Sequence, residues 1–411
     1  MGQEWHRNMI SQSTPPHWQR NLWIVWAAQF LGMIGMSACL PFIPFYLREI
    51  GTTDPESVKL WSGLILSGPF FASIVVAPLW GALGDRLGLK LMVVRAFIGL
   101  ALALVFMAFV TTALQLFMLR VAQGLVSGFI AASIAFVSSQ VPEERSSYAL
   151  GVLQTSTSTG AILGPVAGGL LADTIGMRNV FVVVAAMCLV SGVAVGLLVT
   201  EHRNTKSHDT RYTTFENIRF VMQQPHLARL MTLLVVVQFT LMLSPVLLPF
   251  LVEAVAPNTV FLATMTGILL MARGIVGALA APWWGRIADR RGHAGLLRIA
   301  LLTAAIVSVL HSVAPSFASL VIIQALFGLC SAAPLVLLYG AVSKVSPRER
   351  RGGIMGVSSS ATQLGHLGGP LMGGALASIV GLRPAFLVVA LLFACILALI
   401  PRSLRKPNDV S

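Results

Sequence analysis

The sequence predicts an all-α membrane protein whose twelve membrane-spanning helices form two six-helix bundles. The first observation is composition: 56% of the 411 residues are hydrophobic and only 10% are charged, too few to cover a water-soluble globule of this size. The second is that the apolar runs are far longer than the roughly ten residues of a membrane β-strand. The third is a repeat, because motifs of the first half recur about 204 residues later.

Each span follows from an apolar run long enough to cross a hydrocarbon core of about 30 Å. Helices are expected because lipid offers no partner for backbone polar groups, and a helix satisfies them internally. The predicted spans cover residues 22–47, 60–82, 91–110, 114–138, 147–171, 178–200, 228–252, 261–283, 296–314, 317–343, 354–378 and 383–400.

The longest polar segment divides these spans six and six, and we interpret it as a linker carrying a short amphipathic helix on the membrane surface. The predicted divisions are an N-terminal tail 1–21, a first bundle 22–200, the linker 201–227, a second bundle 228–400 and a C-terminal tail 401–411. The tails and alternate connections hold 22 of the 28 Lys and Arg residues, and the opposite connections hold four. Because positive loops stay in the cytoplasm, both termini are predicted to be cytoplasmic.

The net charge of +13 reflects this topology and not a nucleic-acid-binding surface, since the basic residues lie between apolar runs. Cys39, Cys188, Cys330 and Cys395 lie inside apolar runs without metal-ligand spacing, which indicates small buried side chains. No metal or cofactor is expected. The nucleotide-binding pattern GxxxxGK[ST] is absent, so ATP is not the direct energy source.

Two motifs establish the repeat. PLWGALGDRLG (78–88) aligns with PWWGRIADRRG (282–292) at an offset of 204, and the segment 151–169 aligns with 356–374 at an offset of 205. Two independent motifs with nearly one offset predict homologous halves in the same orientation. This is the parallel repeat of transporters that rock around a central site.

The first motif falls in the short connection after the second predicted span and recurs after the eighth. Its glycines permit a tight turn, and its Asp and Arg can pair with neighbouring charges or with helix-end dipoles. The residues of interest are Gly81, Asp85, Arg86, Gly88 and Lys90 in the first half and Asp289 and Arg290 in the second. An anchored loop without a switching role is the structural alternative.

A basic residue lies within the fourth predicted span, in the segment LRVAQG (119–124). A guanidinium inside the hydrocarbon region costs roughly 2.5 kcal/mol or more, so Arg120 needs partners or water. Arg120, Gln123, Gly124 and Gly128 are spaced by three and four residues and are expected to share one helix face. We expect this face, with Arg120 and Gln123, to line a substrate or proton pathway. Permanent bonds from Arg120 to helix-end carbonyls are the structural alternative.

The second half presents different side chains at related positions. Gln324 stands where the first half has Arg120, and Arg273 in the eighth span is a second intramembrane base. His311 and His366 also lie in apolar spans, where a neutral imidazole is either a packing residue or a proton carrier. We assign Gln324, Arg273 and His366 to the same pathway, with buried structural pairing as the alternative for Arg273.

The fifth predicted span carries a pattern of small residues. It consists of Gly151, Gly160, Gly164, Pro165, Gly168 and Gly169. Such a stripe admits close helix packing, and the proline removes a backbone donor and bends the helix. The copy in the eleventh span shows that plain packing between the halves is a compatible interpretation.

With these motifs the chain resembles, over its whole length, the twelve-helix drug:proton antiporters of the major facilitator superfamily, close to the MdtG-type multidrug resistance exporters. In that family the loop motif is a conformational latch, and the glycine pattern is the antiporter motif associated with exporters. The resemblance implies the major facilitator fold and proton-coupled antiport of drug-like molecules without covalent chemistry. It also implies a monomer in the bacterial cytoplasmic (inner) membrane, with protons and lipid as further partners.

One feature departs from the family. Many of its exporters carry an acid in the middle of the first helix, whereas this chain has no acid centrally in any predicted span. Glu49, Glu253 and Asp173 lie at span ends, where solvation at the membrane interface is the simplest interpretation. Arg120 and Arg273 without central carboxylates predict a cavity of positive potential and therefore an anionic, zwitterionic or neutral cargo.

Three other classes of function make different demands on the sequence. A facilitator or proton symporter for a small metabolite shares the fold and the loop motif, and the sequence leaves it open. An intramembrane enzyme would need a nucleophile with a base or metal ligands, yet HExxH, GxSxG and paired acids are absent from the spans. A receptor or scaffold would need larger polar domains than the linker offers.

Overall fold

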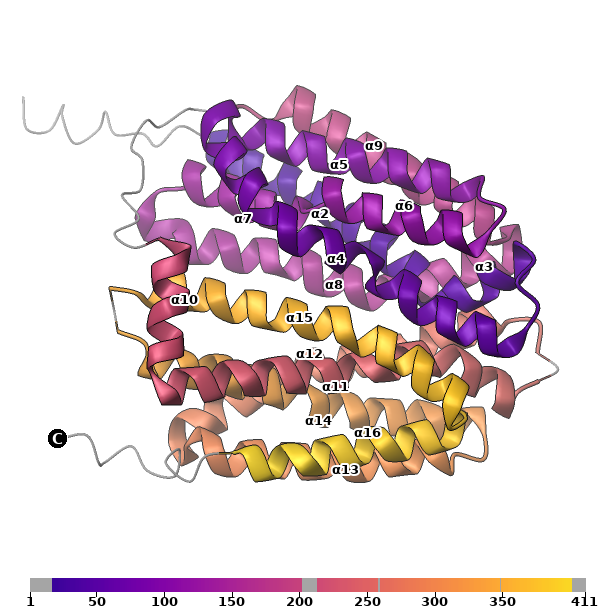
Figure 1. The fold of residues 1–411 in the computed structure, drawn as a ribbon. Coiled ribbons are helices and arrows are strands. Elements are labelled where there is room, and N and C mark those ends of the chain that lie inside the picture. Colours follow the sequence, from indigo (N-terminus) through magenta and orange to yellow (C-terminus); the bar gives the residue numbers. More distant parts are fainter. Residues whose placement is uncertain (1–16, 202–212, 258, 348, 401–411) are drawn as a thin grey trace, which may run out of the picture.

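The computed structural model describes residues 17–201, 213–257, 259–347 and 349–400. Every regular element in these ranges is helical. The axes of the long helices are roughly aligned, with consecutive spans running in opposite directions (Figure 1). The short α10 (Thr214–Gln223) lies across their ends (Figure 1). The predicted fold class, an all-α membrane protein with two bundles, is therefore confirmed.

The first half contributes six spans, two of which are divided. The first span consists of α2 (His17–Cys39), η1 (Leu40–Phe42) and α3 (Ile43–Glu49), and the fourth consists of α6 (Ala113–Val126) and α7 (Phe129–Gln140). The other four spans are single helices: α4 (Pro55–Leu87), α5 (Leu89–Ala108), α8 (Glu143–Ile175) and α9 (Met177–Leu198). The second half contributes α11 (Pro225–Val255), α12 (Leu262–Arg291), α13 (His293–Ser312), α14 (Phe317–Val345), α15 (Arg351–Ile379) and α16 (Leu382–Leu399).

The long helices end at two opposite ends of the molecule (Figure 1). The terminal end is where α2 begins and α16 ends, and the distal end is where α3 ends and α4 begins (Figure 1). At the terminal end, a glycine forms the turn of each loop motif. Gly88 has φ 106° and Gly292 has φ 84°, and such positive φ values favour a residue without Cβ.

The fourth span differs from the single helix predicted over 114–138. It is broken at Ser127 and Gly128, and Gly128 adopts φ 117°, a value that other residues rarely reach. The indole of Trp80 donates to the carbonyl oxygen of Leu125 at 2.7 Å, which satisfies a group freed by the break. The sequence pattern missed this break because the apolar run continues through it on both sides.

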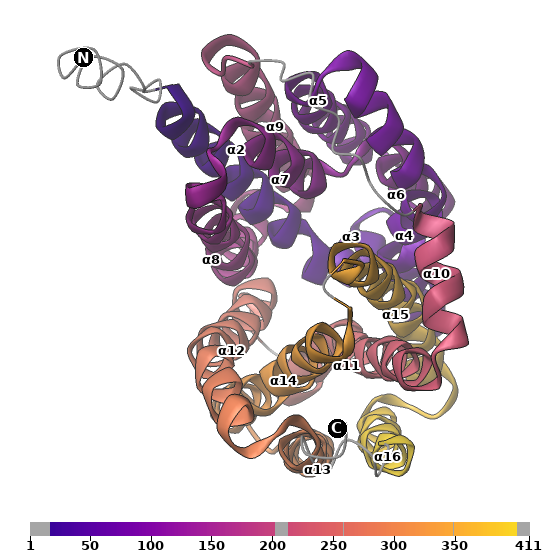
Figure 2. The ribbon, with the colours of Figure 1, turned by 90° about the vertical axis from the view of Figure 1, so that its left-hand side faces the viewer.

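By length and composition, ten spans in the described residues are apolar enough to cross a membrane. The other two long helices, α8 and α15, have 33 and 29 residues but carry the glycine- and hydroxyl-rich repeat. They belong to the interface between the halves, where α8 packs against α12 and α15 packs against α4 (Figure 2). The lower hydropathy of α8 and α15 is explained by their contacts with other helices, because these faces do not meet lipid.

Each half has its own hydrophobic core. One core gathers side chains from residues 18–199 and the other from residues 221–400. Phe250 and Ala263 of the second half join the first core, both near the distal end. The halves are therefore separate bundles that meet at the distal end.

One cysteine prediction was wrong, because Cys395 lies on the exposed face of α16, whereas the other three cysteines are buried.

The glycine stripe of α8 packs mainly within its own bundle. A Cβ at Gly160 would lie 2.7 Å from Cβ of Met33, and one at Gly164 would lie 2.6 Å from the carbonyl oxygen of Ile34. Gly168 meets the backbone of Ala38 in the same way. The first three stripe contacts thus join α8 to α2, because only glycine lets these backbones approach so closely.

We predict that Gly164→Leu destabilises the first bundle by roughly 1–3 kcal/mol or more, because the added side chain forces α8 away from α2. The measurement is the melting temperature of the purified protein in detergent. Gly151→Leu is the matched control, since a Cβ at Gly151 meets nothing within 4 Å. Equal melting temperatures for the two variants would contradict the packing role of Gly164.

Candidate functional site

At the distal end an ion pair joins the two bundles. Arg48 at the end of α3 donates from its two terminal nitrogens to the two carboxylate oxygens of Glu253 in α11, at 2.6 and 2.8 Å. Both side chains are 35% exposed. The residues are 205 positions apart, which is the offset of the internal repeat, so equivalent positions of the two halves face each other. A bidentate pair of this kind fixes geometry as well as charge.

A second distal contact comes from Asp173 near the end of α8. Its carboxylate accepts hydrogen bonds from the backbone nitrogens of Thr264 at 2.7 Å and of Ala263 at 3.3 Å. These groups open α12, which has no side-chain cap of its own. Asp173 therefore caps a helix of the opposite bundle, where a negative charge is favoured by unsatisfied N–H groups and the helix dipole.

These contacts correct the interpretation of the three acids as merely solvated. Glu253 and Asp173 bridge the bundles, and Glu49 lies 3.6 Å from the guanidinium of Arg178 within the first bundle. A signal for one of them was present in the sequence. The repeat offset pairs Arg48 with Glu253, and opposite charges at equivalent positions near a symmetry axis are a reason to expect a bond.

Backbone contacts close the same distal half. A Cβ at Gly169 of α8 would lie 2.5 Å from the carbonyl oxygen of Ala263, and one at Gly63 of α4 would lie 2.5 Å from that of Pro370. Pro165 of the antiporter motif likewise contacts Gly267 of α12. The last glycine and the proline of the motif thus face the opposite bundle, while Gly160, Gly164 and Gly168 face α2.

The terminal half of the same α8 face is uncovered. Ile162 packs against Gly274 of α12, and the next positions toward the terminal end at helical spacing are Ser158, Thr155 and Gly151. All three are exposed. In α15, Ser359 and Ser360 are exposed as well. The bundles therefore touch in the distal half and separate toward the terminal end, where neutral polar side chains line both sides.

Arg120 is 2% exposed and lies deep in the first bundle. Its Nε donates to the carbonyl oxygen of Ile65 at 3.3 Å, and Nη1 donates to Oε1 of Gln123 at 2.7 Å. A Cβ at Gly68 would lie 3.1 Å from Cβ of Arg120, so a small neighbour does leave room. Both acceptors are neutral, and no acid of the described residues forms an ion pair with Arg120.

Arg273 is partly buried in α12, and its guanidinium lies 4.8 Å from the centre of the Phe327 ring. Its backbone packs against Gly328, at the place that Pro69 occupies against Gly124 in the first half. Like Arg120, it forms no ion pair among the described residues. The structure does not bring the two arginines into mutual contact.

Two histidines share one pattern of hydrogen bonds. His366 Nδ1 bonds the carbonyl oxygen of Thr362 at 3.0 Å, and its Nε2 lies 3.1 Å from Nε2 of Gln238. His311 repeats this with Val307 at 2.9 Å and Gln324 at 3.1 Å. Because a carbonyl only accepts, each Nδ1 carries the proton and each Nε2 accepts from the glutamine amide.

The surroundings of the two histidines differ. His311 is 1% exposed and stacks on Phe386, inside the second bundle. His366 is only partly buried, and its ring centre lies 5.2 Å from that of Phe70 in α4. His366 therefore stands at the contact between the bundles, whereas Gln324, predicted for the pathway, bonds the enclosed His311.

The latch residues lie at the terminal ends of α4, α5 and α12. Asp289 pairs with Lys344 at 3.2 Å, and Glu201 accepts from the backbone nitrogen of Leu89 at 2.7 Å. Both contacts stay within one bundle. Arg86 and Arg290 are exposed, Gly88 closes a turn and Lys90 is partly buried. The surroundings of Gly81 and the side chain of Asp85 lie outside the described part of the structure.

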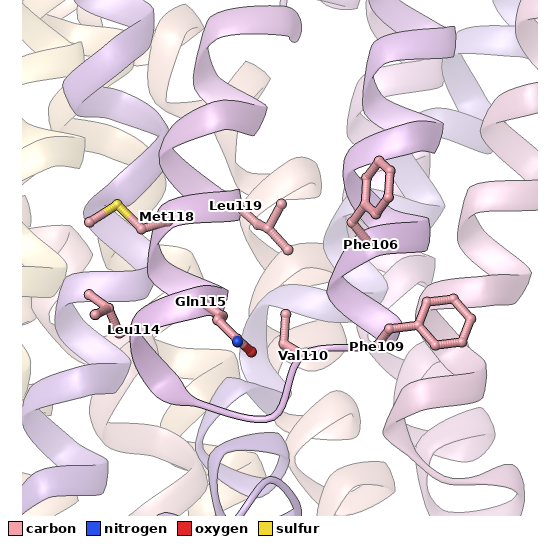
Figure 3. A pocket seen from close by; sticks show the side chains of 7 residues that line it. All are labelled: Phe106, Phe109, Val110, Leu114, Gln115, Met118 and Leu119. Carbon is pink, nitrogen blue, oxygen red and sulfur yellow. The ribbon is translucent and has the colours of Figure 1, made fainter.

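A shallow hollow of about 540 Å³ lies near the distal end between α5 and α6, away from the bundle interface (Figure 3). Phe106, Phe109, Leu114 and Met118 line it and are exposed. Gln115 is its polar member, and its side-chain oxygen accepts from the backbone nitrogen of Thr111. The hollow belongs to the lipid-facing surface. No group of three potential metal ligands occurs in the described ranges.

Comparison with known proteins agrees with this architecture. The model of the Major Facilitator Superfamily matches residues 25–256 and 230–410. The multidrug resistance protein MdtG of Klebsiella pneumoniae (strain 342) is 32% identical over 412 residues, covering 97% of each chain.

Solved structures share the fold. A bacterial homologue of the human lysosomal transporter Spinster, in an inward-facing and unoccupied conformation, has a TM-score of 0.77 at 15% identity, covering 94% of this chain and 97% of the other. The nucleoside transporter NupG has a TM-score of 0.79 at 13% identity, covering 92% and 98%. The chain therefore belongs to the major facilitator superfamily and is a multi-pass membrane transporter of small molecules, not an enzyme.

Proposed function

We propose that this transporter is a secondary active multidrug exporter that exchanges amphiphilic drug-like molecules for protons by alternating access. The observation that carries the proposal is the relative named a multidrug resistance protein, which is 32% identical over nearly the whole of both chains. The geometry supports alternating access, because the two bundles touch at one end and separate at the other. A rocking motion of one bundle against the other would close the open end and open the closed one.

The distribution of Lys and Arg supports a bacterial inner membrane location with both termini in the cytoplasm. The terminal end then opens to the cytoplasm, and the distal end is sealed on the opposite side. The Arg48–Glu253 pair, the Asp173 cap and the hydrogen bond of Glu56 in α4 with Ser378 in α15 are polar contacts that must break when the distal end opens. All three lie at the rim, where water replaces the lost partners and keeps the change reversible.

The loop motifs fit a latch at the terminal end. In this state they bond within their own bundles, as Asp289 does with Lys344. Closure of the terminal end would bring the exposed Arg86 and Arg290 toward the opposite bundle. The proposed role of Asp85, Asp289 and their neighbours is to hold that second state, with the chain working as a monomer.

The proposed cargo is anionic, zwitterionic or neutral. Arg120 is bonded only to neutral acceptors, and Arg273 has a ring instead of an acid beside it. The proposed pathway thus carries positive charge without a described carboxylate at the same depth. In a low-dielectric site such charge disfavours a cation and favours an anion by a similar amount.

We expect efflux-deficient cells that produce this chain to resist anionic, zwitterionic and neutral compounds more than matched cations. Resistance should disappear with an uncoupler, because the proton gradient drives export. Arg120→Gln and Arg273→Gln should each reduce the preference against cations. The measurement is growth inhibition across compounds that differ only in charge. Preferential resistance to quaternary ammonium compounds, unchanged by either substitution, would overturn the assignment of charge. Uncoupler-independent uptake would instead indicate a facilitator.

We expect Arg48→Glu and Glu253→Arg, made singly, to open the distal end by placing like charges together. A half-exposed bidentate pair contributes about 1 kcal/mol, which corresponds to about a fivefold change in the population of the two states. The double variant exchanges the charges and should restore both the population and export. The readout is the distance between spin labels on the two bundles. Failure of the double variant to recover would show that the pair does not hold the distal end.

A further inference from the structure

We propose that His366 is the residue that carries the coupled proton, with Gln238 as the partner that adapts when the proton binds. This inference rests on proton-coupled export. The chain has no acid centrally in any span, and the distal acids are poorly suited to the task. The carboxylates of Glu253 and Asp173 hold the distal end closed in their charged form. Their protonation would open that end.

An antiporter needs the opposite response. The proton-loaded form must return from the distal-open to the distal-closed state, so protonation has to favour closure. His366 meets this requirement by its position. Its ring lies 5.2 Å from that of Phe70 across the bundle contact, with 30° between the planes. A positive imidazolium over an aromatic face is attracted by the ring quadrupole. Protonation therefore strengthens a contact that exists only when α4 and α15 are together.

The hydrogen bonds show how the added proton is accommodated. Gln238 donates to the neutral His366 Nε2, and its own Oε1 is buried without a partner. When Nε2 gains a proton it can only donate. A half-turn of the Gln238 amide then presents Oε1 to the new N–H and removes the unsatisfied acceptor. The pair thus has one bonding arrangement for each protonation state.

No described carboxylate lies beside His366 at this depth, and the nearest base in the opposite bundle, Arg120, is bonded to the carbonyl oxygen of Ile65 and to Gln123 beside Gly68 of α4. Tyr339 in α14 lies near, since its hydroxyl is 3.4 Å from that of Thr362. Two further thiols, Cys330 in α14 and Cys395 in α16, lie on helices packed against α15. The remaining described titratable or charged groups on these helices lie near helix ends. They are Glu56, Lys59 and Arg86 in α4, Glu216 and Arg219 in α10, His226, Arg229 and Glu253 in α11, Lys344 in α14, Arg351 in α15 itself and Arg383 in α16.

His311 provides an internal control. It has the same two hydrogen bonds, and Oε1 of its partner Gln324 is likewise buried without a bond. However, it is sealed inside one bundle and stacked on Phe386. It faces no surface that separates during the cycle. The contact with the other bundle, and not the His–Gln bond alone, is what couples His366 to the change of state.

The test measures the distal distance without any substrate. The full chain, with Cys395→Ser and spin labels at Thr53→Cys and Val260→Cys, is placed in lipid nanodiscs. The pH is lowered from about 8 to about 5.5, a range that spans imidazole titration and stays above that of ordinary carboxylates. We expect the distal-closed population to rise by about threefold or more in the wild type and in His311→Gln.

His366→Gln should abolish this rise, and Gln238→Glu should move its midpoint upward by about one pH unit, since a carboxylate favours the imidazolium. An unchanged rise in His366→Gln, or no rise in the wild type, would overturn the inference. This outcome is separable from failure of the proposed function. Loss of drug resistance in the cell assay would reject the exporter even if the pH response at His366 were found.

Discussion

The two bundles hold together because helix backbones approach each other closely at small residues of the interface. Lipid tails are as apolar as leucine side chains, so burial alone does not hold two bundles together in a membrane. Contact between them comes from packing at small residues and from polar groups at the rim. Gly169 against Ala263 and Gly63 against Pro370 supply the first, and Asp173 supplies the second.

These contacts lie in one half of the interface, and this asymmetry makes the arrangement suited to transport. Small residues give surfaces that fit closely yet carry few long side chains that must rearrange when the surfaces separate. The polar contacts sit where water is available. The packing inside each bundle therefore stays the same in the two states of the transport cycle. The contacts that differ between the states are confined to a few groups at the rim and the interface.

The sequence predicted the fold well because its signals are local or periodic. Apolar run length gave the spans, and the repeated Gly-Pro pattern gave the two halves. The site was predicted less completely, since partners distant in sequence decide it. Arg120 was recognised because a guanidinium is energetically unfavourable in the hydrocarbon region. Its hydrogen bond to the carbonyl oxygen of Ile65 could not be predicted from the sequence. Gln238, which lies beside His366, looked like any polar residue in a span. The break at Gly128 left no trace in hydropathy.

The ion pair between Arg48 and Glu253 has a consequence for the symmetry of the molecule. On a two-fold axis a residue meets its own counterpart, so a chain made of two identical halves would set arginine against arginine or glutamate against glutamate. Attraction at this point is available only to halves that have diverged. The distal seal is thus a place where the protein depends on broken symmetry, while its helix packing depends on symmetry being kept. A tandem copy of either half alone would keep the helix packing and lose this ion pair.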